Sequence, residues 1–159
     1  MTIGQILALL GAAIAVIGSG MGSSAGVGIA GETSAGVSTE NPEVNSKLLL
    51  LQLLPATQGI YGFLIAVIVL INTNVLGGVM KAVELYQGLG ILIGCLPVGL
   101  VGYFSGIKQG KVAAAAMIMT GQRPDMSGKG ITMTVMVETY AVLALLVSFL
   151  VVNSINLLG

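Results

Sequence analysis

One carboxylate lies inside an otherwise uncharged stretch near the end of the chain. Glu138 follows eight residues without a charge and lies about nine residues, or roughly 13 Å of helix, beyond Lys129. If this stretch crosses a membrane, the carboxylate is near the middle, where a charge is expensive and marks a functional candidate by default. The plainer alternative is a packing carboxylate that neighbouring hydroxyl groups satisfy.

Polar side chains on an earlier segment share one helical face. They have the spacing i, i+3, i+4 and i+7: Leu54, Thr57, Gln58 and Tyr61. Thr57 lies about ten residues beyond Lys47, so it has the same depth as Glu138. Pro55 removes a backbone donor, which is expected to leave a carbonyl oxygen nearby without a helical partner. Ordinary hydrogen bonding between helices would explain this stripe alone, but its coincidence in depth with Glu138 favours a site.

A third segment adds a second amide side chain. Gln109 lies about eleven residues before the turn at 121–124, again at a comparable depth. The combined groups are one carboxylate, one hydroxyl, two amide carbonyls and a backbone carbonyl, and a hard cation prefers such oxygen ligands. One monovalent cation would neutralise the single carboxylate, and a proton would compete for it.

Three further residues receive no chemical role. Lys108 and Lys111 are expected to extend along the helix toward water or to face a solvated interior. Either lysine could instead act as a counter-ion for Glu138, but this arrangement would oppose cation binding. Cys95 is expected to be a small packing residue.

The composition identifies a membrane protein. Of 159 residues, 55% are apolar and only 8% are charged, and the mean hydropathy is +1.02. The chain has no His and one Cys, which excludes disulfide scaffolds, Cys/His zinc sites and catalysis by histidine. Its net charge of zero, with six basic residues, gives no electrostatic footprint for nucleic acid. No bond chemistry is expected in this chain.

Four apolar segments are long enough to cross a bilayer as helices. No charge occurs between Met1 and Glu32, and further apolar runs cover 48–71, 85–107 and 131–152. The N-terminus lacks the basic region of a signal peptide, so the first segment is expected to be mature structure. These spans leave no room for a soluble domain, which predicts a single all-α membrane domain over 1–159.

The connections predict an orientation in the cell membrane. The connections that contain Pro42 and Pro124 lie on the same side and together hold three basic residues, whereas the middle connection has only Lys81. The positive-inside rule then places the two Pro turns in the cytoplasm and both termini outside.

The chain is predicted to be a duplicated helical hairpin, with repeats at about 1–75 and 83–159. Residues 41–47 correspond to 123–129 at an offset of 82, which also aligns Ala56 with Glu138. Earlier in each half, residues 19–21 match 105–107 at an offset of 86, so about four extra residues are expected before the first Pro turn. The repeats run in the same direction, unlike the inverted repeats of many secondary transporters.

Small residues four apart mark the first helix of each hairpin. The first helix has two files, Gly20, Ser24, Gly28 and Gly18, Gly22, Gly26, Ala30; the third has Gly90, Gly94, Gly102, Gly106, Gly110 and Ala114. Such files permit close approach of helices in lipid. The first and third helices are therefore expected to form a crowded inner layer, with the second and fourth facing lipid.

Three motifs carry a resemblance to a known family. They are Leu53–Gly62 (LLPATQGIYG), Ser105–Ala115 (SGIKQGKVAAA) and Met136–Ala141 (MVETYA). The chain resembles the proteolipid, known as c or K, that builds the rotor ring of V-type ATPases, and is most similar to the sodium-translocating bacterial form. The resemblance covers essentially the whole chain. It implies a homo-oligomeric ring in lipid that turns against a stator membrane subunit with half-channels, driven through a central-stalk subunit on the cytoplasmic side by a separate ATP-hydrolysing head.

The resemblance also implies a ligand set. Glu138, Thr57, Gln58, Gln109 and the backbone carbonyl of Leu54 would bind Na⁺, and Tyr61 would hold Glu138 in place by a hydrogen bond. Na⁺ would be the transported ion, and this chain would bind no nucleotide. The alternatives are the same rotor carrying H⁺ and a small four-helix secondary transporter.

Overall fold

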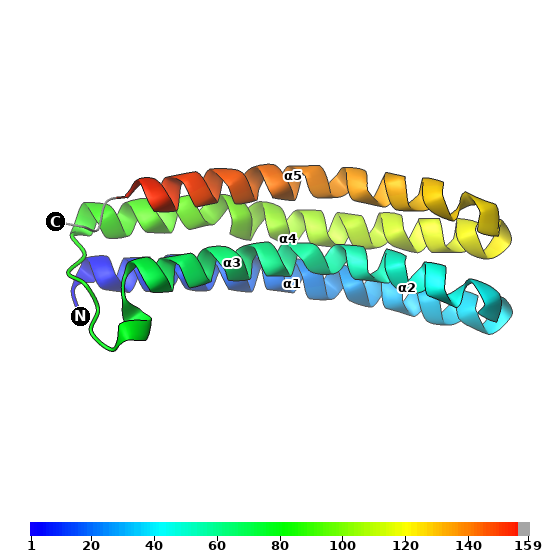
Figure 1. Ribbon diagram of the computed structural model, residues 1–159, viewed down its shortest axis with the longest axis horizontal. Helices are drawn as coiled ribbons and strands as arrows, with labels where there is room; N and C mark the ends of the chain where they lie inside the picture. Colours follow the sequence, from blue (N-terminus) through cyan, green and yellow to red (C-terminus); the bar gives the residue numbers. More distant parts are fainter. Residues whose placement is uncertain (156–159) are drawn as a thin grey trace.

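The structure, a computed structural model, describes residues 1–155 as four long helical segments (Figure 1). The helices are α1 (Ile3–Glu40), α2 (Asn45–Leu53), α3 (Thr57–Asn72), α4 (Leu85–Gln122) and α5 (Ser127–Ser154). Short 3₁₀ turns lie between them: η1 (Pro42–Val44), η2 (Leu54–Ala56), η3 (Val75–Gly77) and η4 (Pro124–Met126). The predicted spans are confirmed, because all four segments are long and apolar enough to cross a membrane.

The helices extend further than the apolar runs alone suggested. α1 and α4 each contain 38 residues, or about 57 Å of helix, against a hydrocarbon thickness of about 30 Å. Thr2 and Gln5 cap the start of α1, and the backbone N–H of Gln5 donates to Thr2 Oγ1 at 3.2 Å. Pro42 and Pro124 follow the last residues of α1 and α4 and begin the two turns. These turns lie at the opposite end of the molecule from both labelled termini (Figure 1).

The two hairpins share one offset over their whole length. α1 begins at Ile3 and α4 at Leu85, and both run for 38 residues to the Pro turns, so the offset is 82 from the first residue onward. The expected offset of 86 in the first helices, and the four extra residues that it required, are therefore wrong. Small residues recur every four positions on both helices, so a match displaced by one helical turn still aligns small residues with small residues. The repeat boundaries stay a prediction, and residues 156–159 of the second repeat lie outside the described residues.

Close backbone contact joins α1 to α4. A β-carbon on Gly26 would overlap the carbonyl oxygen of Gly106, and one on Gly110 would overlap the backbone of Gly26. At Gly18, a β-carbon would lie 2.6 Å from the carbonyl oxygen of Gly99. The first and third helices thus pack tightly through glycine, as predicted. Cys95 is buried in an apolar cluster with residues such as Ala8, Ile65 and Ile91, so its predicted packing role is confirmed.

One of the predicted small-residue files takes no part in this contact. Nothing lies within 4 Å of a β-carbon built on Gly20 or Gly28, and Ser24 between them is exposed. On α4, Gly94 faces α5 rather than α1, since its nearest neighbour is Val151. The file of Gly18, Gly22 and Gly26 therefore forms the contact with α4, whereas the face of α1 that carries Gly20, Ser24 and Gly28 remains open among residues 1–155.

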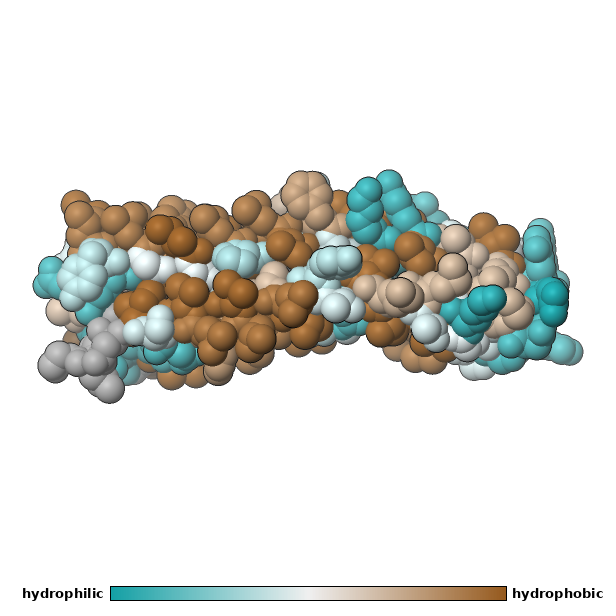
Figure 2. Space-filling model, turned by 90° about the horizontal axis from the view of Figure 1, so that it is seen from above, coloured by the Kyte–Doolittle hydropathy of each residue, from teal (hydrophilic) through white to brown (hydrophobic). Residues whose placement is uncertain are grey.

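The outer surface is largely apolar. Large exposed side chains on α3 and α5 include Ile60, Phe63, Leu143 and Leu150. Figure 2 shows apolar residues over most of one face, with hydrophilic residues at both ends and in a patch between the middle and the turn end. This surface suits lipid or further protein.

Candidate cation site

A break in the second membrane segment positions the first polar groups. Pro55 is buried in the 3₁₀ turn between α2 and α3, and Ser23 Oγ of α1 donates a hydrogen bond to its carbonyl oxygen at 2.7 Å. The Leu54 carbonyl accepts from both the backbone N–H of Thr57 and its hydroxyl, the latter at 3.0 Å. The carbonyl without a helical partner that was expected near Pro55 is therefore not that of Leu54. Its oxygen nevertheless lies beside the Thr57 hydroxyl, which is free to rotate.

Glu138 is held between two other helices. The Tyr61 hydroxyl of α3 donates a hydrogen bond to Glu138 Oε1, and Gln109 Nε2 of α4 donates to Glu138 Oε2 at 3.3 Å. The Glu138 side chain is half-buried on α5. Hydrogen bonds from a phenol and an amide orient both carboxylate oxygens, so the carboxylate is a fixed acceptor at the meeting point of α3, α4 and α5.

Two buried amides connect this carboxylate to the Pro55 break. Gln58 and Gln109 are both fully buried, and Gln58 Nε2 donates to Gln109 Oε1. Gln109 Nε2 also donates to the carbonyl of Thr134 at 3.3 Å. In this arrangement Gln109 presents its nitrogen to Glu138, so its oxygen could ligate a cation only after the amide rotates.

The structure brings all six predicted residues into one connected network. Thr57 Oγ1 lies 3.5 Å from Gln58 Oε1 and 3.0 Å from the Leu54 carbonyl oxygen, which gathers three neutral oxygens on one face. Gln58 donates to Gln109, and Gln109 donates to Glu138. Tyr61 donates to the other oxygen of Glu138. One carboxylate with neutral oxygens fits a hard monovalent cation better than a soft metal. The role of each residue as a ligand remains a prediction.

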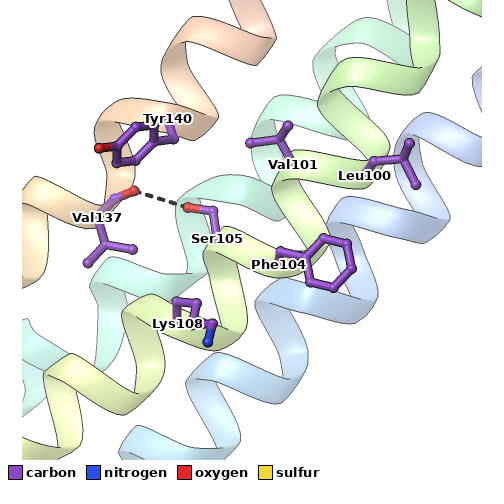
Figure 3. A pocket seen from close by; sticks show the side chains of 7 residues that line it. All are labelled: Leu100, Val101, Phe104, Ser105, Lys108, Val137 and Tyr140. Carbon is purple, nitrogen blue, oxygen red and sulfur yellow. Dashed lines mark hydrogen bonds between the residues drawn. The ribbon is translucent and has the colours of Figure 1, made fainter.

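Ser105 belongs to this network although the pattern of polar residues did not identify it. Its hydroxyl accepts from Gln58 Nε2 at 3.4 Å and donates to the Val137 carbonyl at 3.2 Å, next to Glu138 (Figure 3). Ser105 precedes Gln109 by one helical turn, so the two share a face of α4. That i, i+4 spacing was the available signal.

The two lysines lie outside the network. Lys108 and Lys111 are exposed on α4, and Lys108 lines a groove with Phe104 and Tyr140 (Figure 3). Among residues 1–155, the ion pair that the structure contains joins Arg123 and Asp125 at 3.1 Å in the second Pro turn. The carboxylate of Glu138 therefore has hydrogen-bonding partners rather than a cationic one in this part of the chain, which argues against Lys108 as its counter-ion.

Comparison with known proteins assigns the family. The family model that describes the C subunit of ATP synthase matches twice, over residues 10–69 and 92–151. V-type sodium ATPase subunit K of Enterococcus hirae is 48% identical over 149 residues, covering 94% of this chain and 92% of that protein. A-type ATP synthase subunit K of Methanocaldococcus jannaschii is 37% identical over 134 residues, covering 84% of this chain and 58% of that protein.

A more distant relative is named for a different ion. The 16 kDa proteolipid of the V-type proton ATPase of Ovis aries is 26% identical over 146 residues, covering 92% of this chain and 90% of that protein. The chain belongs to the family of ATP synthase C subunits. The family resemblance is thus confirmed, and the chain is a multi-pass membrane protein in which the domain of this family is duplicated.

Proposed function

We propose that this chain is the rotor-ring subunit of a V-type ATPase and that each copy carries one Na⁺ at Glu138. The observation that carries the proposal is the carboxylate of Glu138, which Tyr61 and Gln109 hold from two other helices. The neutral oxygens of Thr57, Gln58 and Leu54 gather on the connected face of the second segment. The 48% identity to a V-type sodium ATPase subunit K supports Na⁺ as the ion.

The physical role of this site is charge neutralisation. An ionised carboxylate in hydrocarbon needs water or an opposite charge, whereas a carboxylate with one bound monovalent cation is neutral and can face lipid. A stator membrane subunit with two aqueous half-channels would load and unload the site as the ring turns. Moving one charge against 100 mV requires about 2.3 kcal/mol, which ATP hydrolysis in a separate soluble head would supply.

Each site residue then has a defined task. Glu138 supplies the charge, and the oxygens of Leu54, Thr57, Gln58 and Gln109 replace the water that Na⁺ loses. For this, the Thr57 hydroxyl must turn its proton away from the Leu54 carbonyl, to which it now donates. Tyr61 keeps the carboxylate directed into the site through the hydrogen bond to Oε1.

The orientation follows the basic residues of the turns. Lys47 of α2 donates to the Pro124 carbonyl at 2.9 Å, so the two Pro turns and their basic residues lie together at one end. This end would face the cytoplasm and the central-stalk subunit, and both termini would lie outside. The exposed apolar side chains of α3 and α5 would contact lipid.

Proton transport is the second candidate function. The Ovis aries relative belongs to a V-type proton ATPase, and the same carboxylate could carry H⁺ while the amides and hydroxyls only pack. The third possibility, a small secondary transporter, receives no support from the family assignment.

Labelling by a hydrophobic carbodiimide tests the ion. The reagent, dicyclohexylcarbodiimide, requires a protonated carboxyl that is accessible from lipid, so a bound cation should block the reaction at Glu138. We expect Na⁺ to protect the purified protein and an equal concentration of K⁺ to protect it far less. Protection should weaken as the pH falls, because a proton and Na⁺ compete for one carboxylate.

The other outcomes are distinct. Labelling of Glu138 that does not respond to Na⁺ would assign the rotor to H⁺. Failure to label Glu138 under every condition, while the same reagent labels a membrane-embedded carboxyl of a reference protein, would overturn the site.

A further inference from the structure

One face of α4 repeats a packed face of α1 but has no partner among residues 1–155. Gly18, Gly22 and Gly26 pack against α4, and the residues 82 positions later are Leu100, Phe104 and Lys108. These three lie on successive turns of α4 (Figure 3). Leu100 is 55% exposed, Phe104 is 61% exposed and Lys108 is exposed.

The reverse relation holds for α1. The residues of α4 that receive α1 are Gly99, Gly102, Gly106 and Gly110, and the residues 82 positions earlier are Ile17, Gly20, Ser24 and Gly28. Ile17 is 57% exposed, Ser24 is exposed, and a β-carbon on Gly20 or Gly28 would meet nothing within 4 Å. Each half of the α1–α4 contact therefore has an unpartnered counterpart on the opposite helix.

We propose that these two faces join neighbouring copies, with the Leu100, Phe104 and Lys108 face of α4 packed on the Ile17, Gly20, Ser24 and Gly28 face of α1 in the next copy. This inference rests on the ring in the proposed function and specifies the contact between its members. The hairpins run in the same direction, so the step from α1 to α4 can be repeated from α4 to the next α1, and such head-to-tail contacts close into rings. Large side chains on α4 fill the space that the glycines leave open.

The contact within the chain sets the register between copies. Gly22 packs between Gly102 and Gly106, and Gly26 packs between Gly106 and Gly110. Each residue of α1 thus lies between the residues 80 and 84 positions later. The same register is then applied to α4 of one copy and α1 of the next copy. A residue of α4 lies between two residues of that α1, whose numbers are lower by 84 and by 80. Phe104 then lies between Gly20 and Ser24, and Lys108 lies between Ser24 and Gly28.

The charges on the two faces are complementary in this register. Lys111, three residues after Lys108, falls between Val27 and Gly31 of the next copy, one residue before Glu32. Side chains on both helices tilt back toward the N-terminus, and α1 and α4 run in the same direction, so Glu32 and Lys111 remain about three residues, or about 4.5 Å of helix, apart along the axis, which two long side chains can span. Both side chains are exposed, and the described ion pair in residues 1–155 involves neither. Glu32 of one copy pairs with Lys111 of the copy before it.

Disulfide cross-linking tests the packed faces. The double variant Ser24→Cys with Lys108→Cys, in a Cys95→Ala background, should form a ladder of covalent multimers when the membranes are oxidised. Ser24→Cys with Leu150→Cys is the control, because Leu150 is 57% exposed on α5 and lies in the same turn as Val151, which contacts Gly94, more than three helical turns from Lys108. A ring-sized particle that gives no ladder would overturn this interface and leave the proposed function intact. A protein that forms no oligomer at all would overturn both.

Charge reversal tests the ion pair separately. Glu32→Lys and Lys111→Glu should each raise the monomer released from the ring by detergent about threefold, and the double variant should restore the original value. Glu32→Lys combined with Lys108→Glu should not restore it, because Lys108 lies nearer Ser24. A cross-linked ladder without rescue by the Lys111 variant would overturn the ion pair.

Discussion

The two halves of the chain share a backbone but not a chemistry. At the offset of 82, the counterpart of Glu138 is Ala56, that of Gln109 is Val27 and that of Tyr61 is Leu143. The carboxylate, its amide partner and its phenol partner thus all give way to apolar side chains at the equivalent junction. By contrast, both halves contribute glycines to the contact between α1 and α4, and each half has a Pro turn.

This difference separates the residues that pack the helices together from the residues of the candidate cation site. Close packing requires only small residues at regular spacing, so both repeats can contribute such residues to the contact between α1 and α4. A charged group in hydrocarbon requires a complete set of partners, so losing the set and the charge together leaves a stable apolar junction. Four membrane segments therefore carry one ionisable site, and a ring of such chains would move one ion per copy.

Removing the carboxylate is expected to have the largest effect. Glu138→Gln keeps the shape of the side chain but removes the charge that neutralises Na⁺. Loss of one partner from a buried charge pair costs about 3–5 kcal/mol, so the affinity for Na⁺ should fall by at least about 100-fold. Binding of radioactive Na⁺ to the purified protein measures this change. Unchanged Na⁺ binding would show that the cation is held elsewhere.

Moving the carboxylate to the first half of the chain tests whether Na⁺ binding requires the hydrogen-bonding partners of the carboxylate. The double variant Glu138→Gln with Ala56→Glu should not recover Na⁺ binding, because Val27 of the same copy and Leu143 of the adjacent copy in the proposed ring supply no hydrogen bonds at the new position. Adding Val27→Gln and Leu143→Tyr supplies both missing donors and should recover part of the binding. Recovery by Ala56→Glu alone would show that the partners of the carboxylate are dispensable.

The packing common to both repeats can be tested through two glycines of α1. Gly26→Ala should destabilise the fold by about 1–3 kcal/mol, because the added methyl group overlaps the Gly106 carbonyl oxygen. Gly36→Ala is the matched control, since nothing lies within 4 Å of its β-carbon and alanine stabilises a helix by about 0.5–1 kcal/mol. Unfolding in mixed detergent micelles, followed by circular dichroism, gives both values. Equal stability of the two variants would contradict the close contact.

Much of the architecture and of the candidate site followed from residue types and spacing. The four apolar runs predicted the helices, and the shared depth of Thr57, Gln109 and Glu138 predicted that their helices meet. These signals are strong because hydrocarbon forbids unpaired polar groups, so polar residues at one depth must find one another.

The remaining details depended on information that spacing does not contain. A repeat of four in the glycines cannot distinguish an offset of 82 from one of 86, because either alignment places small residues together. Ser105 resembles any small residue until the neighbouring Gln58 is known to donate to it. Pro55 predicts a carbonyl oxygen nearby without a helical partner but does not tell which one, and the Leu54 carbonyl accepts from the Thr57 hydroxyl.

Two threonines at equivalent positions test the neutral ligands. Thr57→Val removes the hydroxyl near Gln58 and Leu54 with little change in shape, and the affinity for Na⁺ should fall about tenfold, equivalent to about 1.4 kcal/mol. Thr139→Val, 82 positions later and exposed next to Glu138, should leave the affinity within about twofold. Isothermal titration with Na⁺ measures both. Equal losses in the two variants would mean that the hydroxyl of Thr57 is not a ligand.

The smallest effect is expected at Tyr61, because its hydroxyl orients the carboxylate without touching the cation. Tyr61→Phe removes the hydrogen bond to Glu138 Oε1, worth about 1 kcal/mol, so the affinity for Na⁺ should fall about three- to fivefold. The freed carboxyl should also react faster with the carbodiimide. Tyr140 is 69% exposed two residues after Glu138, and Tyr140→Phe should change neither the affinity nor the labelling rate. A Tyr61→Phe variant with lower affinity but an unchanged labelling rate would mean that Tyr61 supports the packing of α3 rather than the position of the carboxylate.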